Sequence, residues 1–145
     1  GRLDYNTEGV LLLTNDGPLA HALAHPSSKI SRTYHIKVRG NPSPAKFRQL
    51  LSGIQLEDGF AQALHVERLK TTGAGHLWFE MVLAEGRNRE VRRMCEAIGH
   101  AVTRLLRVRF ANIHVEDLVL GQHQELTISE VDALYEIAGL GKSKQ

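Results

Sequence analysis

The sequence predicts an α+β fold with a mixed, mostly antiparallel central sheet and flanking helices. Polar and apolar residues alternate over 31–39, as in a strand with one buried face. Two strand-like segments, 61–70 and 76–84, are separated by a short glycine-rich loop, which favours an antiparallel pair. Helical patterns follow single strands, and 145 residues are enough for one domain with a real core.

The N-terminal stretch is expected to form a loop, a strand and a short helix. The apolar run Val10–Thr14 is typical of a strand that is buried on both faces. Asp16 can cap a helix over Pro18–His25, because proline suits the first helical turn. His21 and His25 would share a face of this helix, but no third ligand lies nearby, so no metal site is predicted.

The next segments are expected to be a strand and a helix. The strand over Ser31–Arg39 buries one face, which holds Tyr34, Ile36 and Val38. A helix is then expected from Pro44, because Ser43 can cap it, and Gly53 marks its end. Residues 55–59 are expected to form a turn before the antiparallel pair.

The third helical pattern is rich in arginine and lies between Gly86 and Gly99. Its apolar positions follow helical spacing: Val91, Met94, Cys95 and Ile98. Four residues are expected to lie off that face: Arg89, Arg92, Arg93 and Glu96. Gly99 is placed to end the helix.

The C-terminal part is expected to hold two strands, a helix and a polar tail. In the strand over Ala101–Phe110, one predicted face holds Val102, Arg104, Leu106, Val108 and Phe110, and the other holds Thr103, Leu105, Arg107 and Arg109. A further strand is expected to end at Leu126. The segment Thr127–Glu130 is typical of a capping box for the last helix, and 141–145 form a polar tail.

Composition excludes some classes of protein and leaves others open. No apolar run approaches the length of a membrane span, and no secretory leader is visible. The single cysteine, Cys95, cannot form an internal disulfide and fits a reducing compartment. The formal net charge is only +2, but residues 85–109 hold seven arginines against three acidic residues. This segment is either a solvated basic helix face or a surface that binds phosphates.

The first seventeen residues, GRLDYNTEGVLLLTNDG, carry the most specific signal. An aspartate in a loop is usually solvated or forms a local turn, but Asp4 could also be a carboxylate nucleophile beside a cation. The string resembles the signature of the pseudouridine synthases that modify ribosomal RNA. The elements SRTYHIKV and EGRNREVRRM are similar to two further motifs of that family, the latter closer to the large-subunit enzymes.

The resemblance implies a role for each of nine residues. Asp4 corresponds to the nucleophile, Arg92 to the arginine that pairs with it, and Tyr34 to the tyrosine that packs against the base and removes the C5 proton. The alternative for Tyr34 is a plain core residue. Six more positions are implied to bind RNA or line the base pocket: Arg2, Leu3, Arg87, Arg89, Leu105 and Arg107. For Leu105 and Arg107 the alternative is a charged strand edge.

The reaction implied is the isomerisation of a uridine in ribosomal RNA to pseudouridine, without metal, nucleotide or redox cofactor. The implied partner is a ribosomal RNA stem-loop, and the implied protein is a cytoplasmic monomer when complete. Residues 1–140 would form the catalytic domain without its N-terminal strands, and an S4-type module often precedes it. The alternatives are a non-catalytic RNA-binding fragment and a glycosidase, although a glycosidase normally needs a second carboxylate.

Overall fold

The computed structural model describes residues 1–71, 75–114 and 118–141. The helices are α1 (Gly17–Ala24), the 3₁₀ turn η1 (Pro26–Ser28), α2 (Pro44–Ser52), α3 (Glu90–Ala97) and α4 (Ile128–Ile137). The strands are β1 (Thr7–Gly9), β2 (Arg32–Arg39), β3 (Ile54–Leu56), β4 (Gly59–Ala61), β5 (His65–Thr71), β6 (His76–Leu83), β7 (Val102–Phe110) and β8 (Ile113–His114). The predicted glycine-rich loop at 71–75 and the predicted polar tail at 141–145 lie largely outside the described residues.

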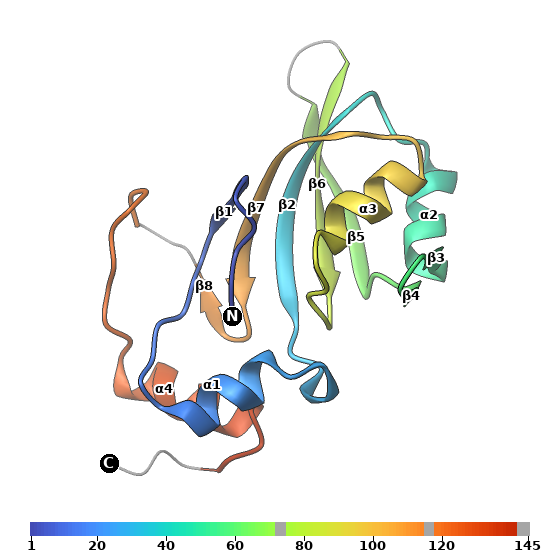
Figure 1. Ribbon diagram of the computed structural model, residues 1–145. Helices are drawn as coiled ribbons and strands as arrows, with labels where there is room; N and C mark the ends of the chain where they lie inside the picture. Colours follow the sequence, from blue (N-terminus) through green and yellow to red (C-terminus); the bar gives the residue numbers. More distant parts are fainter. Residues whose placement is uncertain (72–74, 115–117, 142–145) are drawn as a thin grey trace.

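The main sheet has the strand order β1-β7-β2-β6-β5, and β8 pairs with β7 (Figure 1). Only the β1–β7 pair is parallel; the other described pairs of this sheet are antiparallel. Strands β3 and β4 form a separate hairpin. The predicted class, an α+β fold with a mixed and mostly antiparallel sheet, is confirmed.

The larger core lies between the sheet and helices α2 and α3, which cover the same side of β2, β6 and β5 (Figure 1). Alternate residues of the strands supply one wall, with Ile36, Phe79 and Met81 fully buried. The predicted apolar stripe of α3 supplies the other wall, formed by Val91, Met94, Cys95 and Ile98. The buried face predicted from the alternation in the strands therefore packs against the apolar face predicted from the helical spacing in α3.

A second core lies at the end of the sheet where α1 and α4 pack together (Figure 1). Its buried members come from α1, α4, the β7–β8 hairpin, and the segments that follow β1 and precede β2: Val10, Leu19, Leu23, Ile30, Phe110, Ala111, Ile113 and Leu134. The Tyr135 hydroxyl donates a hydrogen bond to the Asp16 carboxylate, which ties α4 to the start of α1.

The predicted helix caps are present. Asp16 accepts a hydrogen bond from the Leu19 amide at 3.0 Å, and Ser43 accepts one from the Lys46 amide at 3.4 Å. Thr127 accepts from the Glu130 amide, and the Glu130 side chain accepts in return from the Thr127 amide, so the capping box is confirmed.

The predicted strand over Val10–Thr14 is wrong. The strand lies earlier, at Thr7–Gly9, and only Val10 of the apolar run is buried. Leu11 and Leu13 are 44% and 83% exposed, because the chain leaves the sheet after Val10 and crosses to α1. Four adjacent apolar residues indicate burial on both faces only if the backbone stays in the sheet.

The predicted faces of β7 are right for Leu105 and Arg107, which share a side, but wrong for Phe110. Leu105, Arg107 and Phe110 are all buried, although strict alternation places Phe110 opposite the other two. The register with β2 shifts, since Tyr34 lies opposite Arg107 whereas the preceding Thr33 lies opposite Arg109. This bulge inserts one residue and turns Phe110 to the same side as Arg107.

Two smaller predictions, both about where strands begin or end, are also wrong. The residues expected to start a long strand at Ala61 instead end the β3–β4 hairpin, and β5 begins at His65. No strand ends at Leu126 in the described part of the chain; this leucine packs from a loop against the second core.

Candidate functional site

An open cleft of about 570 Å³ lies beside the sheet on the side that carries α3. Four parts of the chain form most of it: residues 1–5 with Thr7, the loop and first turn over 86–92, and inward-facing residues of β2 and of β7; Ala24 of α1 also lines it. The nine residues singled out in the sequence all line this cleft: Arg2, Leu3, Asp4, Tyr34, Arg87, Arg89, Arg92, Leu105 and Arg107. They come from four parts of the chain that only the fold brings together.

Asp4 lies on the loop before β1 and is half-buried. Its carbonyl accepts a hydrogen bond from the Thr7 amide at 2.9 Å, which closes a turn. Strand β1 then holds the loop in place, because Thr7 and Gly9 lie opposite Leu105 and Arg107 in β7. The Asp4 carboxylate therefore lies on a turn that β1 anchors to the middle of strand β7.

Arg92 is buried and faces the same loop, but the expected pair with Asp4 is absent. Its Nη2 donates to the Asn6 carbonyl at 2.9 Å, and none of the ion pairs among the described residues joins Arg92 to Asp4. Asn6 belongs to the turn that Asp4 begins. Arg92 therefore braces the backbone of the turn, and the position predicted to lie off the apolar face of α3 is 9% exposed.

Tyr34, Leu105 and Arg107 lie next to one another in the floor of the cleft. Tyr34 is opposite Arg107 in the β2–β7 pair, and all three side chains are buried. Burial raises the pKa of Tyr34, while the cations of Arg107 and Arg32 act against this rise. At neutral pH the floor therefore presents a neutral phenol next to two buried guanidinium groups.

Arg107 is held by the segment that follows β1. Its Nε and Nη2 both donate to the Val10 carbonyl, at 3.1 and 2.8 Å, and its guanidinium lies 4.8 Å from the centroid of the Phe110 ring. Burial lowers the pKa of this guanidinium. The interpretation of Leu105 and Arg107 as a charged strand edge is wrong, because β1 covers this edge of β7.

Arg32 is a cleft residue that the sequence reasoning missed. It is 7% exposed, its Nη1 donates to the Ile30 carbonyl at 2.7 Å, and its guanidinium lies 5.1 Å from the centroid of the Phe110 ring. A Cβ on Gly86 would come within 3.3 Å of the Arg32 Nε, so the glycine lets the loop pack against this cation. The sequence could have predicted this position, because Arg32 lies two residues before Tyr34 and therefore shares its face of β2.

Arg87 is engaged in a network of acidic groups. It donates to the Asp58 carboxylate at 3.0 Å, to Glu85 at 3.0 Å and to Glu90 at 3.1 Å. Arg93 donates to both oxygens of Asp58, at 2.8 and 3.1 Å, and this contact holds the pKa of Asp58 below its usual range. The network fastens the start of α3 to the β3–β4 turn and leaves Arg87 few free donors for a ligand.

The carboxyls of Glu85 and Glu90 titrate as a pair. Burial, followed by the hydrogen bond with Glu85, raises the pKa of Glu90, whereas the same hydrogen bond lowers the pKa of Glu85. Glu90 is the first residue of α3 and is 2% exposed. Below about pH 7 Glu90 therefore keeps its proton more readily than Glu85 does.

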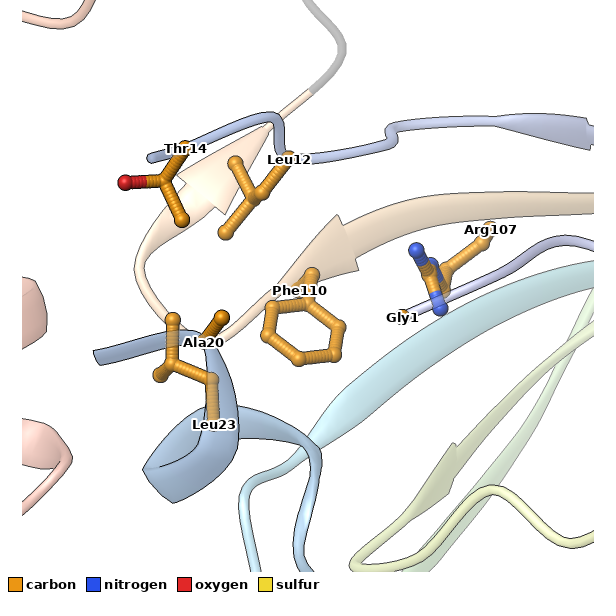
Figure 2. A pocket seen from close by; sticks show the side chains of 7 residues that line it. All are labelled: Gly1, Leu12, Thr14, Ala20, Leu23, Arg107 and Phe110. Atoms are coloured by element: carbon orange, nitrogen blue, oxygen red, sulfur yellow. The ribbon is translucent and has the colours of Figure 1, made fainter. Parts of the chain in front are cut away.

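A separate small hollow of about 30 Å³ lies behind the cleft, with room for about one water molecule. Figure 2 shows Leu12, Leu23 and Phe110 around it, with the Arg107 side chain on one side. Its lining mixes apolar side chains with Thr14 and Arg107 and holds no carboxylate of the described residues. The larger cleft is therefore the candidate site.

The charge of the cleft favours an anionic ligand. Six arginines line it against two carboxyl groups, Asp4 and Glu90, and burial favours the neutral form of Glu90. Arg2 and Arg89 are exposed at its rim, where they can reach a ligand from solution. The one group of three possible metal ligands among the described residues lies elsewhere, at His65, Glu67 and Glu80.

Comparisons with known proteins agree with this geometry. Residues 1–97 match the family described as RNA pseudouridylate synthase. A protein of Pseudomonas aeruginosa named "Ribosomal large subunit pseudouridine synthase B" is 43% identical over 141 residues, which cover 97% of this chain and 36% of that protein. A Bacillus subtilis protein of the same name is 44% identical over 148 residues, with coverage of 99% and 59%.

A solved structure described as a pseudouridylate synthase superposes with a TM-score of 0.83 at 28% identity. The match covers 92% of this chain and 57% of that one. The chain spans 36%, 59% and 57% of the lengths of these three proteins. No helix of the described residues has both the length and the apolar character that crossing a membrane requires.

Proposed function

Because the chain belongs to the RNA pseudouridylate synthase family, we propose that it isomerises a uridine of ribosomal RNA to pseudouridine, with Asp4 as the nucleophile. The names of the P. aeruginosa and B. subtilis relatives support the large-subunit RNA as the substrate. One observation carries the proposal: a half-buried aspartate on an anchored turn faces a cleft that is rich in arginine, with a buried tyrosine in its floor.

The reaction breaks the bond between N1 of uracil and C1′ of the ribose, rotates the base and joins C5 to C1′. Asp4 either attacks C1′ or assists departure of the base through a glycal, and both routes need an ionised, well-oriented carboxylate. The turn closed by Thr7 and braced by Arg92 supplies the orientation. In this proposal Arg92 acts through the Asn6 backbone, so it is a positioning residue.

The target base must leave its helix before it can enter the cleft, at a cost of a few kcal/mol. Arg2 and Leu3, next to Asp4, are placed to hold the RNA open. Arg89, exposed at the other rim, is placed to contact phosphates. Leu105 would pack against the flipped base from the floor of the cleft.

Tyr34 would lie against the uracil ring and take part in removal of the C5 proton. Its raised pKa means that it begins as a neutral phenol, so it serves as a base only to the extent that Arg107 and Arg32 stabilise the phenolate. Arg107 is thereby assigned two tasks, holding the Val10 carbonyl and tuning Tyr34.

We further propose that residues 1–140 belong to the catalytic domain of a cytoplasmic enzyme that works as a monomer when complete, and that its reaction needs no metal or other cofactor. The single cysteine, Cys95, is buried, and burial raises its pKa to about 12, which keeps the thiol unreactive. A ribosomal RNA stem-loop is the proposed partner.

The proposal is tested by tritium release from ribosomal RNA transcripts that carry 5-³H-uridine. We expect release by the chain, and a loss of at least about a thousandfold in Asp4→Asn, because the amide cannot act as a nucleophile. RNA affinity should change little, since the substitution preserves the shape of the side chain. Glu125→Gln removes an exposed carboxylate elsewhere and is the matched control.

Two results would count against the proposal. Equal release by Asp4→Asn and the unmodified chain would remove Asp4 from the chemistry. A chain that binds the transcript but releases no tritium, even with the preceding part of a longer relative supplied in trans, would support the non-catalytic alternative.

A further inference from the structure

Four titratable side chains meet on the face of the sheet that points away from α2 and α3. His35 in β2, Glu80 in β6 and Glu67 in β5 lie opposite one another in three adjacent strands. His65 lies two residues before Glu67 and so shares its face of β5. The neighbouring Tyr34 points to the other side of the sheet, into the cleft, so this cluster is separate from the proposed catalytic groups.

The spacing of three of these side chains suits a metal ion. The Nε2 of His65 lies 3.4 Å from Oε2 of Glu67 and 3.5 Å from Oε2 of Glu80, and a ligand atom from each residue lies within 4.8 Å of the other two. In a tetrahedral zinc site with bonds of about 2.0–2.2 Å, neighbouring ligand atoms are about 3.3–3.6 Å apart. The two closer pairs already have this separation without movement of the backbone.

The remaining histidine orients one of the ligands. His35 Nε2 lies 3.1 Å from Oε1 of Glu80, the carboxylate oxygen that faces away from His65. Hydrogen bonds to the second oxygen of a metal-binding carboxylate fix its orientation and raise affinity. Glu80 is also the least exposed of the four, at 24% of its side chain, so its position is well constrained.

Charge favours a cation at this point. Glu67 and Glu80 are directly opposite in the β5–β6 pair, and like charges in that arrangement destabilise a sheet. A divalent ion between them would neutralise both carboxylates. The irregularity of this strand pair lies farther on, between Arg68 and Lys70, so the ladder is regular where the cluster sits.

We propose that His65, Glu67 and Glu80 bind one divalent transition-metal ion of the zinc type, with His35 as a positioning residue and water in the fourth position. Imidazole and carboxylate together suit zinc, whereas magnesium and calcium prefer oxygen ligands alone. The ion would tie the edge strand β5 to β6 and stabilise the folded chain by mass action.

Isothermal titration with ZnCl₂, after dialysis against a chelator, tests the proposal together with the melting temperature. We expect one saturable site, a higher melting temperature with zinc, and no such site with MgCl₂. His65→Ala should abolish the site while the fold persists, because half of this side chain is exposed. His35→Ala should weaken binding by about ten- to a hundredfold.

The matched control is His21→Ala, since His21 and His25 form the other histidine pair, on α1, with ring centroids 5.3 Å apart. The control should bind zinc like the unmodified chain. Loss of the site in His21→Ala, its survival in His65→Ala, or the lack of any saturable site in the unmodified chain would overturn the proposal. The zinc titration does not measure RNA isomerisation, so the metal site can be confirmed or overturned even if the proposed function is wrong.

Discussion

At the scale of single residues, the cleft combines groups that would be costly to bury alone. Tyr34, Arg107 and Arg32 are each buried; the two guanidinium charges act to lower the pKa of Tyr34, and Tyr34 acts to raise the pKa of both arginines. Phe110 offers its ring to both guanidinium groups, at 5.1 Å for Arg32 and 4.8 Å for Arg107. Such contacts offset part of the lost hydration of the cations.

The variant Tyr34→Phe distinguishes the packing of the ring against the base from the removal of a proton by the hydroxyl. We expect Tyr34→Phe to keep RNA affinity but to slow isomerisation by about a hundred- to ten-thousandfold, the usual contribution of an acid–base group. Single-turnover tritium release at several pH values measures this. An unchanged rate would show that the ring alone is needed and that another group takes the C5 proton.

Glu90 predicts a pH dependence of stability. Its folded-state pKa of about 7 lies above its ordinary value of 4.5, so the protonated carboxyl stabilises the fold. This contribution is complete below about pH 4.5 and is lost as the pH rises through 7. The pKa of Glu85 is lowered, so its effect on the free energy of unfolding falls below pH 4.5 and does not overlap with that of Glu90.

We therefore expect the free energy of unfolding to fall between pH 5 and 8, on the order of 1–3 kcal/mol, and to fall less in Glu90→Gln. Urea unfolding at a series of pH values measures it. The exposed Glu136→Gln is the control and should keep the slope of the unmodified chain. Parallel curves for Glu90→Gln and the unmodified chain would contradict the assignment.

At the scale of elements, strand β1 determines where the Asp4 turn lies. Gly9 ends this strand with a φ of 122°, and a Cβ there would come within 2.1 Å of the Arg107 carbonyl oxygen. Only glycine permits so close an approach of the two backbones. The same contact places Val10 where its carbonyl accepts from Arg107.

Gly9→Ala should therefore separate β1 from β7 and displace the Asp4 turn. We expect a loss of at least about 1–3 kcal/mol of stability together with reduced isomerisation. Gly17→Ala is the control, because a Cβ at Gly17 meets nothing within 4 Å. Equal thermal stability of the two variants would show that β1 does not depend on the glycine.

At the scale of the whole molecule, the exposed side of the first segment carries apolar surface. Leu11 and Leu13 are largely exposed, and β1 is an edge strand of the sheet. An open edge with nearby apolar side chains promotes association. We expect the chain to self-associate as its concentration rises, and the double variant Leu11→Lys/Leu13→Lys to do so less. Sedimentation velocity checks this, and a monomer at all concentrations would contradict it.

Much of the fold and of the site could be predicted from local patterns. Ser43 and Thr127 start helices because their side chains cap nearby amides, and the stripe of α3 faces the core because its spacing matches the helix. The family motifs likewise pointed to Asp4, Tyr34 and Arg92, because specific strings of residues carry that information. The cleft gathers all three.

The sequence by itself thus determined the fold class, the starts of α1, α2 and α4, the buried face of β2, the apolar stripe of α3, and nine of the residues that line the cleft. Only the tertiary structure decided which atoms meet: the bulge that turns Phe110 beside Arg107, the hydrogen bond from Arg92 to Asn6, and the cluster around Glu80. The physical reason is the distance along the chain over which each interaction acts. Caps and periodic patterns act within a few residues, whereas strand register and side-chain contacts depend on partners far away in the chain.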